Sequence, residues 1–170
     1  GGNTVTFTTT GTITLDDNVT LNASTGPTNL VTFNPNGLIS DGSYGPKGIT
    51  KAGTGNVNLS HAHPYSGATS VTAGILALTA ANGSLPGTSG IAVSGGTLQL
   101  NNTSAANNTN RVPDSTVITM TGGTLDFKSD AAAATNYSET IAVTADGGGT
   151  INASQAAADG TSTLTIGTFV

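Results

Sequence analysis

The feature of this sequence that most constrains its fold is a short unit that recurs along the chain. Three stretches align on a shared glycine: SVTAGILAL at 70–78, AVSGGTLQL at 92–100 and TMTGGTLDF at 119–127. A more divergent copy, VTADGGGTINAS, follows at 143–154. Repeats of this length are typical of proteins in which equivalent units stack on one another. The sequence therefore predicts a solenoid.

Each copy predicts two short strands that meet at a glycine corner. In the copy at 92–100, apolar and polar residues alternate after the corner, so Leu98 and Leu100 share one face of a strand. We expect the equivalent apolar residues of the copies to form one inward column, here called the leucine column: Leu76, Leu98, Leu125 and Ile151. We expect a positive φ at the corner glycines, which are Gly74, Gly96, Gly123 and Gly149.

Strands of three to five residues cannot bury an apolar face alone, but parallel stacking of equivalent strands solves this problem. The predicted fold is therefore all-β: a right-handed parallel β-solenoid of about seven coils with variable loops. We predict a single domain over residues 1–170, with repeat units at about 70–91, 92–118, 119–142 and 143–170. The largest insertions, 101–115 and 128–139, should emerge on the same side, and 130–140 is expected to be a loop or one helical turn.

Composition excludes several classes of function. The chain has only four lysine and arginine residues, so no basic patch can neutralise several phosphates and nucleic acid is not an expected partner. The absence of cysteine excludes disulfides, thiolate zinc sites and a cysteine nucleophile. No apolar run is long enough to predict a membrane span.

The metal candidates are weak. His61 and His63 would point the same way in an extended segment, but no third ligand lies nearby, so we favour a solvated loop over a metal site. Clustered oxygens at Asp16 and Asp17, and at Asp146 before three glycines, raise calcium as an alternative. An aspartate in such a turn more often accepts a hydrogen bond from its own backbone, so we expect no cofactor.

Catalytic and sugar-binding patterns are also missing. The nine acidic residues are scattered, and Arg111 is the only arginine, so the sequence shows no facing pair of carboxylates with a basic partner. We therefore predict that the protein is not an enzyme. Three tyrosines, Tyr44, Tyr65 and Tyr137, are too far apart in the sequence to predict a platform for sugar stacking.

One segment resembles a known family. Residues 48–60 read GITKAGTGNVNLS, 65–67 read YSG and 71–78 read VTAGILAL. This order and spacing resemble the autotransporter-associated β-strand repeat of bacterial surface proteins. In this chain His63 and Pro64 stand where that family usually has a polar corner with asparagine. The resemblance implies a passenger-type location, extracellular or on the bacterial cell surface, and a repetitive architecture without a specific activity.

The two ends of a solenoid expose unpaired strand edges, and neither end of this sequence shows a polar or helical cap. We predict that the edges associate, through Thr4, Val5 and Phe7 at one end and through Leu164, Ile166 and Phe169 at the other. The leading hypothesis is a structural subunit that polymerises head to tail into a surface fibre or layer. The alternative is an adhesin or passenger segment whose loops at 101–115 and 128–139 bind a surface glycan or host matrix.

Overall fold

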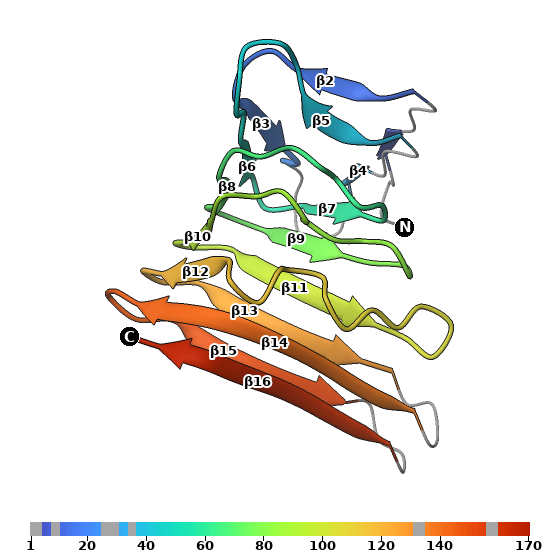
Figure 1. Ribbon diagram of the computed structural model, residues 1–170, viewed down its shortest axis with the longest axis vertical. Helices are drawn as coiled ribbons and strands as arrows, with labels where there is room; N and C mark the ends of the chain where they lie inside the picture. The colour runs from blue at the N-terminus through green and yellow to red at the C-terminus, as the bar shows by residue number, and fades with distance from the viewer. Residues whose placement is uncertain (1–4, 8–10, 25–30, 34–36, 131–134, 156–159) are drawn as a thin grey trace.

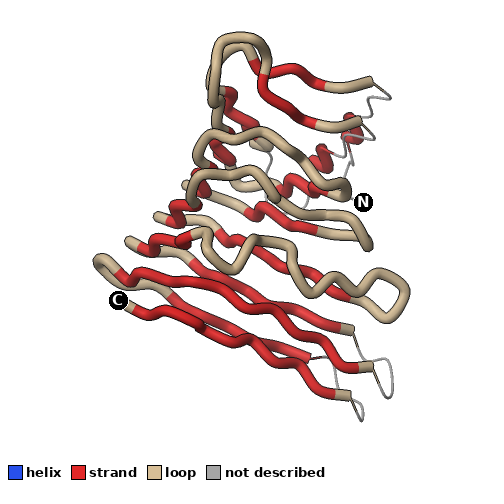
Figure 2. Tube along the Cα trace, in the orientation of Figure 1, coloured by secondary structure: helices blue, strands red, loops and turns tan. Residues whose placement is uncertain are grey.

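The computed structural model describes residues 5–7, 11–24, 31–33, 37–130, 135–155 and 160–170. Over these residues the chain is a parallel β-solenoid without helices, as Figure 2 shows. Successive levels follow one another along the rod in chain order (Figure 1). No helix of the described residues has the length and apolarity needed to cross a membrane. The predicted fold class, an all-β solenoid with parallel strands, is confirmed.

Two seven-stranded sheets form the long sides of the rod, and every pairing within them is parallel. The first sheet contains, in spatial order, β1 (Val5–Phe7), β4 (Val31–Phe33), β7 (Asn56–Leu59), β9 (Ile75–Leu78), β11 (Thr97–Asn102), β13 (Thr124–Ser129) and β15 (Thr150–Gln155). The second contains β3 (Val19–Asn22), β6 (Ile49–Ala52), β8 (Thr69–Val71), β10 (Ile91–Val93), β12 (Val117–Met120), β14 (Asn136–Ala145) and β16 (Thr161–Phe169).

The count of regular turns differs from the sequence prediction. The first two levels each contain a third strand, and these two strands, β2 (Ile13–Leu15) and β5 (Ile39–Asp41), pair as a small sheet of their own. The two-strand pattern that the repeats predict begins at β7 and extends over about five turns, which differs slightly from the predicted seven because the first two levels carry a third strand.

A third side of the rod continues below β5 without regular strands. The Tyr65 N–H donates to the Ile39 carbonyl at 3.3 Å, and the Leu85 N–H donates to the Arg111 carbonyl at 2.8 Å. Between these two levels, the His63 N–H donates to the Ser84 carbonyl at 3.0 Å. Irregular segments therefore stack on one another as the parallel strands do, and they form the wall that contains the buried His63 and Arg111.

Backbone pairing aligns the leucine column. Leu98 pairs in register with Leu76 on one side and with Leu125 on the other, and Leu125 pairs with Ile151. The three leucines are fully buried, which is worth about 1.5–3 kcal/mol for each side chain. Ile151 is 36% exposed, because among the described residues no further turn covers β15.

The corner positions require glycine for two different reasons, a positive φ at some corners and a lack of space for a Cβ at another. Gly74, Gly123 and Gly149 have φ values of 64°, 67° and 143°, which favour glycine over residues with a Cβ. The expectation of a positive φ is wrong at Gly96, which is absent from the positive-φ glycines of the described chain. Space explains the glycine there, because a Cβ would lie 2.8 Å from Cγ1 of Val71 in the preceding turn.

The interpretation of 130–140 as a loop or one helical turn is wrong over its second half. The ten-residue strand β14 begins at Asn136, while 131–134 lie outside the described residues. Tyr137, Glu139 and Ile141 alternate inward along β14 and are all buried. The sequence did not predict this strand because a charged residue, Glu139, occupies an inward position where the period-two pattern requires an apolar residue.

The corner at Gly74 gives a direct test of the stacking. In Gly74→Ala, the new Cβ would lie 2.3 Å from the Gly55 carbonyl oxygen and 2.4 Å from that of Gly53, at a positive φ. We expect the free energy of unfolding to fall by about 1–3 kcal/mol in urea titrations. Gly90→Ala is the control, since its nearest contact would be 3.7 Å away, and it should stay within about 1 kcal/mol of wild type. Equal losses in both variants would contradict this account of the corners.

Candidate functional site

The last described turn exposes apolar side chains at positions whose equivalents point inward in the turns above it. β15 and β16 are the edge strands of the two large sheets. Ile151, Ile166 and Phe169 are 36%, 38% and 63% exposed. Exposed apolar groups beside unpaired strand edges are typical of surfaces that associate with another chain.

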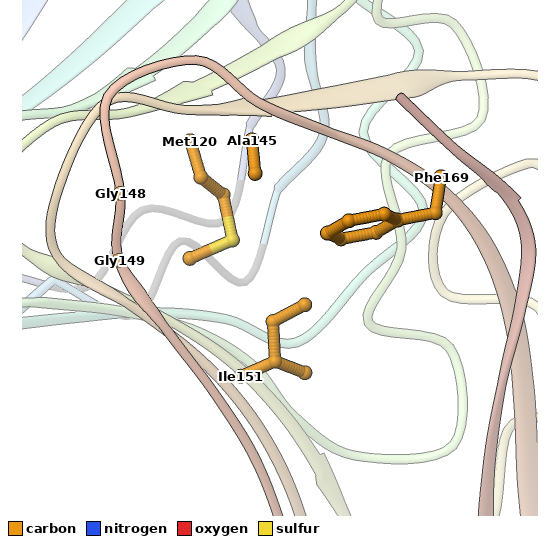
Figure 3. A pocket seen from close by; sticks show the side chains of 6 residues that line it. All are labelled: Met120, Ala145, Gly148, Gly149, Ile151 and Phe169. Atoms are coloured by element: carbon orange, nitrogen blue, oxygen red, sulfur yellow. The ribbon is translucent and has the colours of Figure 1, made fainter.

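A shallow hollow of about 100 Å³ lies within this end surface. Figure 3 shows the ring of Phe169 facing Met120 and Ala145 across the hollow, with Ile151 on a third side and Gly148 and Gly149 along the adjacent backbone. A bulge between Ile141 and Ala142 shifts the register of β14 against β16, so that Phe169 pairs with Val143. The bulge thus places Phe169 on the apolar side of its strand. We refer to this surface as the end surface: Met120, Ala145, Ile151, Ile166 and Phe169.

The predicted edge residues fall on both ends of the rod. Val5 and Phe7 lie on β1, which is the opposite edge of the first sheet, and Thr4 lies outside the described residues. Leu164 lies in β16 and is half-buried against the core. The register of the leucine column continues upward through Val57 and Phe33 to the position of Phe7. One column of equivalent positions therefore runs from edge to edge of the first sheet.

Lys51, which the sequence analysis counts only among the four lysine and arginine residues, is a buried charged group. Its Nζ donates to the carbonyl oxygens of Ala52, Gly53 and Ala73 at 2.7, 2.8 and 3.0 Å. Burial lowers the pKa of Lys51 to about 8, while three carbonyl acceptors favour the protonated amine that can satisfy all of them. Lys51 therefore joins the glycine corners of two successive turns. The burial of Lys51 could have been predicted from the period of two in a strand, because Lys51 lies two residues after the inward-facing Ile49.

His63 has a structural role, and the expectation of a solvated loop is wrong for it. The side chain is fully buried, and its Nδ1 accepts the Ile39 N–H at 3.0 Å. Burial, with a smaller effect of His61, lowers the pKa of His63 to about 4, so the ring is neutral. The ring of His61 lies 6.3 Å away between centroids. Among the described residues no group of three His, Cys, Asp or Glu side chains could hold a metal.

Arg111 organises the loop that follows β11. Its guanidinium donates to Asn102 Oδ1 at 2.9 Å and to the carbonyl oxygens of Gly83, Asn101 and Ala106 at 2.7, 2.8 and 3.2 Å. Burial lowers the pKa of Arg111 to about 10, an effect that Glu139 opposes. Arg111 thus joins the Gly83 level, the end of β11 and the loop carbonyl of Ala106, and so supports the predicted recognition loop from within.

Glu139 is the buried acid below Arg111. Its Oε1 accepts the Val112 N–H at 3.0 Å, and its buried Oε2 has no hydrogen-bond partner among the described residues. Burial raises the pKa of Glu139 to about 7, and hydrogen bonds to Val112 and Arg111 and the charge of Arg111 oppose the rise. This carboxyl group therefore changes charge near neutral pH, which sequence analysis did not predict.

Two further acidic residues, Asp17 and Asp126, accept hydrogen bonds within the rod. Asp17 Oδ1 accepts the N–H of Asn18 at 2.7 Å, as expected of a turn aspartate. Asp126 accepts from Gln99 Nε2 and Asn152 Nδ2, both at 2.9 Å, across three strands of the first sheet. These contacts bring together neighbouring levels of the solenoid. They do not bring two carboxylates to face one another.

The segment 49–78 contains the features just described: β6 to β9, the Lys51 contacts and the corner at Gly74. Residues 49–78 match the passenger-associated-transport-repeat family. The match confirms the resemblance to autotransporter passenger repeats, and this repeat family implies a bacterial surface or secreted protein. No curated protein and no solved structure matches the chain.

The buried carboxyl group predicts a pH dependence of stability. Between about pH 4.5 and pH 7, Glu139 is protonated in the folded state and ionised in the unfolded state, so its contribution to stability falls across this range and is fully lost once the pH has risen through 7. Glu139→Gln keeps an acceptor for Val112 and cannot ionise. From pH 5 to pH 8, urea titrations should show the variant gaining roughly 1–3 kcal/mol of stability relative to wild type.

The comparison is internally controlled, because both proteins keep His63. That residue contributes the opposite slope, a gain of stability as the pH rises from about 4 to 6.5, and it cancels in the difference. A difference between variant and wild type that is the same at pH 5 and pH 8 would show that Glu139 titrates in its ordinary range.

Proposed function

We propose that this protein is a structural, self-associating β-solenoid of the passenger type, located outside the cell or on the bacterial surface and without catalytic activity. The end surface is the observation that supports this function best. It combines two unpaired strand edges with exposed Ile151, Ile166 and Phe169. The passenger repeat at 49–78 supports the location.

The register of the first sheet suggests how two copies would meet. A second copy would add its β1 to the free edge of β15 in parallel, since every pairing in this sheet is parallel. Ile151 of one copy would then take the register position next to Phe7 of the following copy and continue the leucine column. Repetition of a head-to-tail contact that does not close yields a fibre.

The proposal of no catalysis is supported by the roles of the charged groups. Lys51 and Arg111 are bound to backbone carbonyls, and Glu139 accepts a backbone N–H in the wall. Asp126 is bound to two side-chain amides. Each of these groups stabilises the rod itself, which is the use expected in a structural protein.

A second function, adhesion through the two insertions, is favoured by one observation. Asp130 Oδ2 accepts from the Ser104 backbone N–H at 2.9 Å and from its hydroxyl at 3.2 Å, and Asp130 Oδ1 accepts from the Tyr137 hydroxyl. The first insertion is thereby joined to the beginning of the second. With Arg111 holding it from within, this loop is preorganised, which lowers the entropic cost of binding a partner.

Substitutions in the end surface test self-association. In Phe169→Asp, a charge replaces the apolar ring that faces the hollow, and we expect the fibre or oligomer formed by the wild type to be lost. Thr163→Asp is the matched control, with the same charge on an exposed position of the same strand, and it should still assemble. Sedimentation velocity at rising protein concentration measures the effect.

A monodisperse wild-type monomer at high concentration would contradict the proposal, as would unchanged assembly of Phe169→Asp. The same assay separates the two functions. Replacing 104–109 by a Gly-Ser segment of equal length should leave assembly intact and, if the loops are adhesive, abolish binding to glycan-coated surfaces.

A further inference from the structure

A second hollow lies on the outer face of the second sheet, far along the chain from the end surface. Its volume is about 250 Å³. It lies between the turn that precedes β6 and the corner that precedes β8, and we call it the β6–β8 pocket. Its lining residues are Asn18, Pro46, Gly48, Ile49, Thr50, Gly67, Ala68 and Ser70.

Asp41 holds both walls of the β6–β8 pocket in place. Its Oδ1 accepts the Lys47 N–H at 2.9 Å, and its Oδ2 accepts the Ser66 N–H at 2.9 Å and the Ser66 hydroxyl at 2.5 Å. The Ser66 hydroxyl, above all, holds the pKa of Asp41 below its usual value. The pocket is therefore built before any ligand arrives, and Asp41 is a positioning residue that does not itself line it.

At the floor of the pocket, the backbones of two successive turns approach each other so closely that only glycine fits. A Cβ at Gly48 would lie 2.2 Å from the Ala68 carbonyl oxygen, and a Cβ at Gly67 would lie 2.2 Å from the Lys47 carbonyl carbon. The glycines thus permit the stacking of the two turns and leave a depression above them. Pro46 and Ala68 add apolar surface to this depression.

The polar groups of the pocket are neutral hydrogen-bonding groups. Thr50 and Ser70 pair in register on neighbouring strands, so their side chains stand side by side on the outer face. The Asn18 amide oxygen accepts the Gly48 N–H at 2.8 Å, which fixes the third polar group. None of the residues that line the pocket is charged. Small apolar surface beside hydroxyl and amide groups suits an uncharged polyol.

Tyr44 is an exposed aromatic residue close in sequence to the pocket, although it is not among the residues that line the hollow. It is 73% exposed and lies two residues before Pro46, in the same turn that Asp41 holds. The other tyrosines, Tyr65 and Tyr137, are buried. Sugars present C–H groups on one face and hydroxyls around the edge, and an aromatic ring beside polar groups recognises both.

We propose that the β6–β8 pocket binds a neutral saccharide unit, with Tyr44 against one sugar face and Thr50, Ser70 and Asn18 at its hydroxyls. This inference does not depend on self-association, since the pocket lies on the side of the rod. It also differs from adhesion through the insertions, because it places the sugar on the segment that precedes and includes the passenger repeat.

Tyrosine fluorescence provides a local readout, because the protein has no tryptophan and three tyrosines, of which only Tyr44 is exposed. The full chain is titrated with neutral oligosaccharides of glucose, galactose and N-acetylglucosamine, and with a sulfated oligosaccharide for comparison. We expect at least one neutral sugar, and not the sulfated one, to protect Tyr44 from acrylamide quenching. Calorimetry then gives the affinity of that sugar.

Substitutions in and near the pocket test whether the sugar binds there. Loss of the ring in Tyr44→Ala should weaken binding about tenfold, whereas Tyr44→Phe should retain most of it. Thr50→Val removes one hydroxyl with little change in shape and should weaken binding several-fold. Thr119→Val is its matched control, a hydroxyl removed from the same face of β12, outside the pocket. Circular dichroism confirms that each variant is folded.

Three outcomes would overturn the proposal. They are binding of none of the neutral sugars at millimolar concentration, binding of the sulfated oligosaccharide alone, and equal affinity for a neutral sugar in Tyr44→Ala, Thr50→Val and wild type. Failure of the Phe169 experiment would leave these results unaffected, so the two proposals stand or fall separately.

Discussion

Parallel pairing between equivalent positions of successive turns is the interaction on which the rest of this structure depends. It places Leu98 between Leu76 and Leu125, and it brings each glycine corner against the backbone of the corner before it. Apolar burial and backbone hydrogen bonding are therefore satisfied by the same register. A slip of one residue would turn the leucine column outward and bring Cβ atoms into the corners, so the sequence specifies this register strongly.

The few charged residues are used largely to support this stacking. Lys51 ties together the corners of two turns, and Arg111 binds the carbonyl of Gly83 in the irregular wall and that of Asn101 in β11. Removing one partner of a buried charged group usually costs more than the group contributes, because its former partners are left unsatisfied. Glu139, with a pKa near 7, makes the wall sensitive to pH. The surfaces that remain for recognition are consequently almost uncharged, in the β6–β8 pocket as at the end of the rod.

The repeat made the fold predictable, and its limits explain what was missed. The glycine and leucine spacing at 70–127 was sufficient to predict parallel turns and the register that aligns Leu98 with Leu125. Residues before β6 carry the unit only weakly, so a third strand in each of the first two levels, β2 and β5, was not foreseen. Glu139 and His63 occupy inward positions that patterns of hydrophobicity assign to apolar residues. The β6–β8 pocket depends on Asp41 and Ser66, which lie 25 residues apart, and no local pattern reports such a contact.

The parallel register between successive turns can be tested most directly with engineered disulfides, because the chain has no cysteine of its own. Thr97 and Thr124 are register partners on neighbouring parallel strands, which lie about 4.8 Å apart, within the range that a disulfide bridges. Oxidation of the double variant Thr97→Cys/Thr124→Cys should yield an intramolecular disulfide, detected by mass spectrometry. Thr97→Cys/Lys128→Cys, displaced by four residues along the same strand, should remain reduced. Cross-linking of the displaced pair with no cross-link between 97 and 124 would contradict the stacked parallel register.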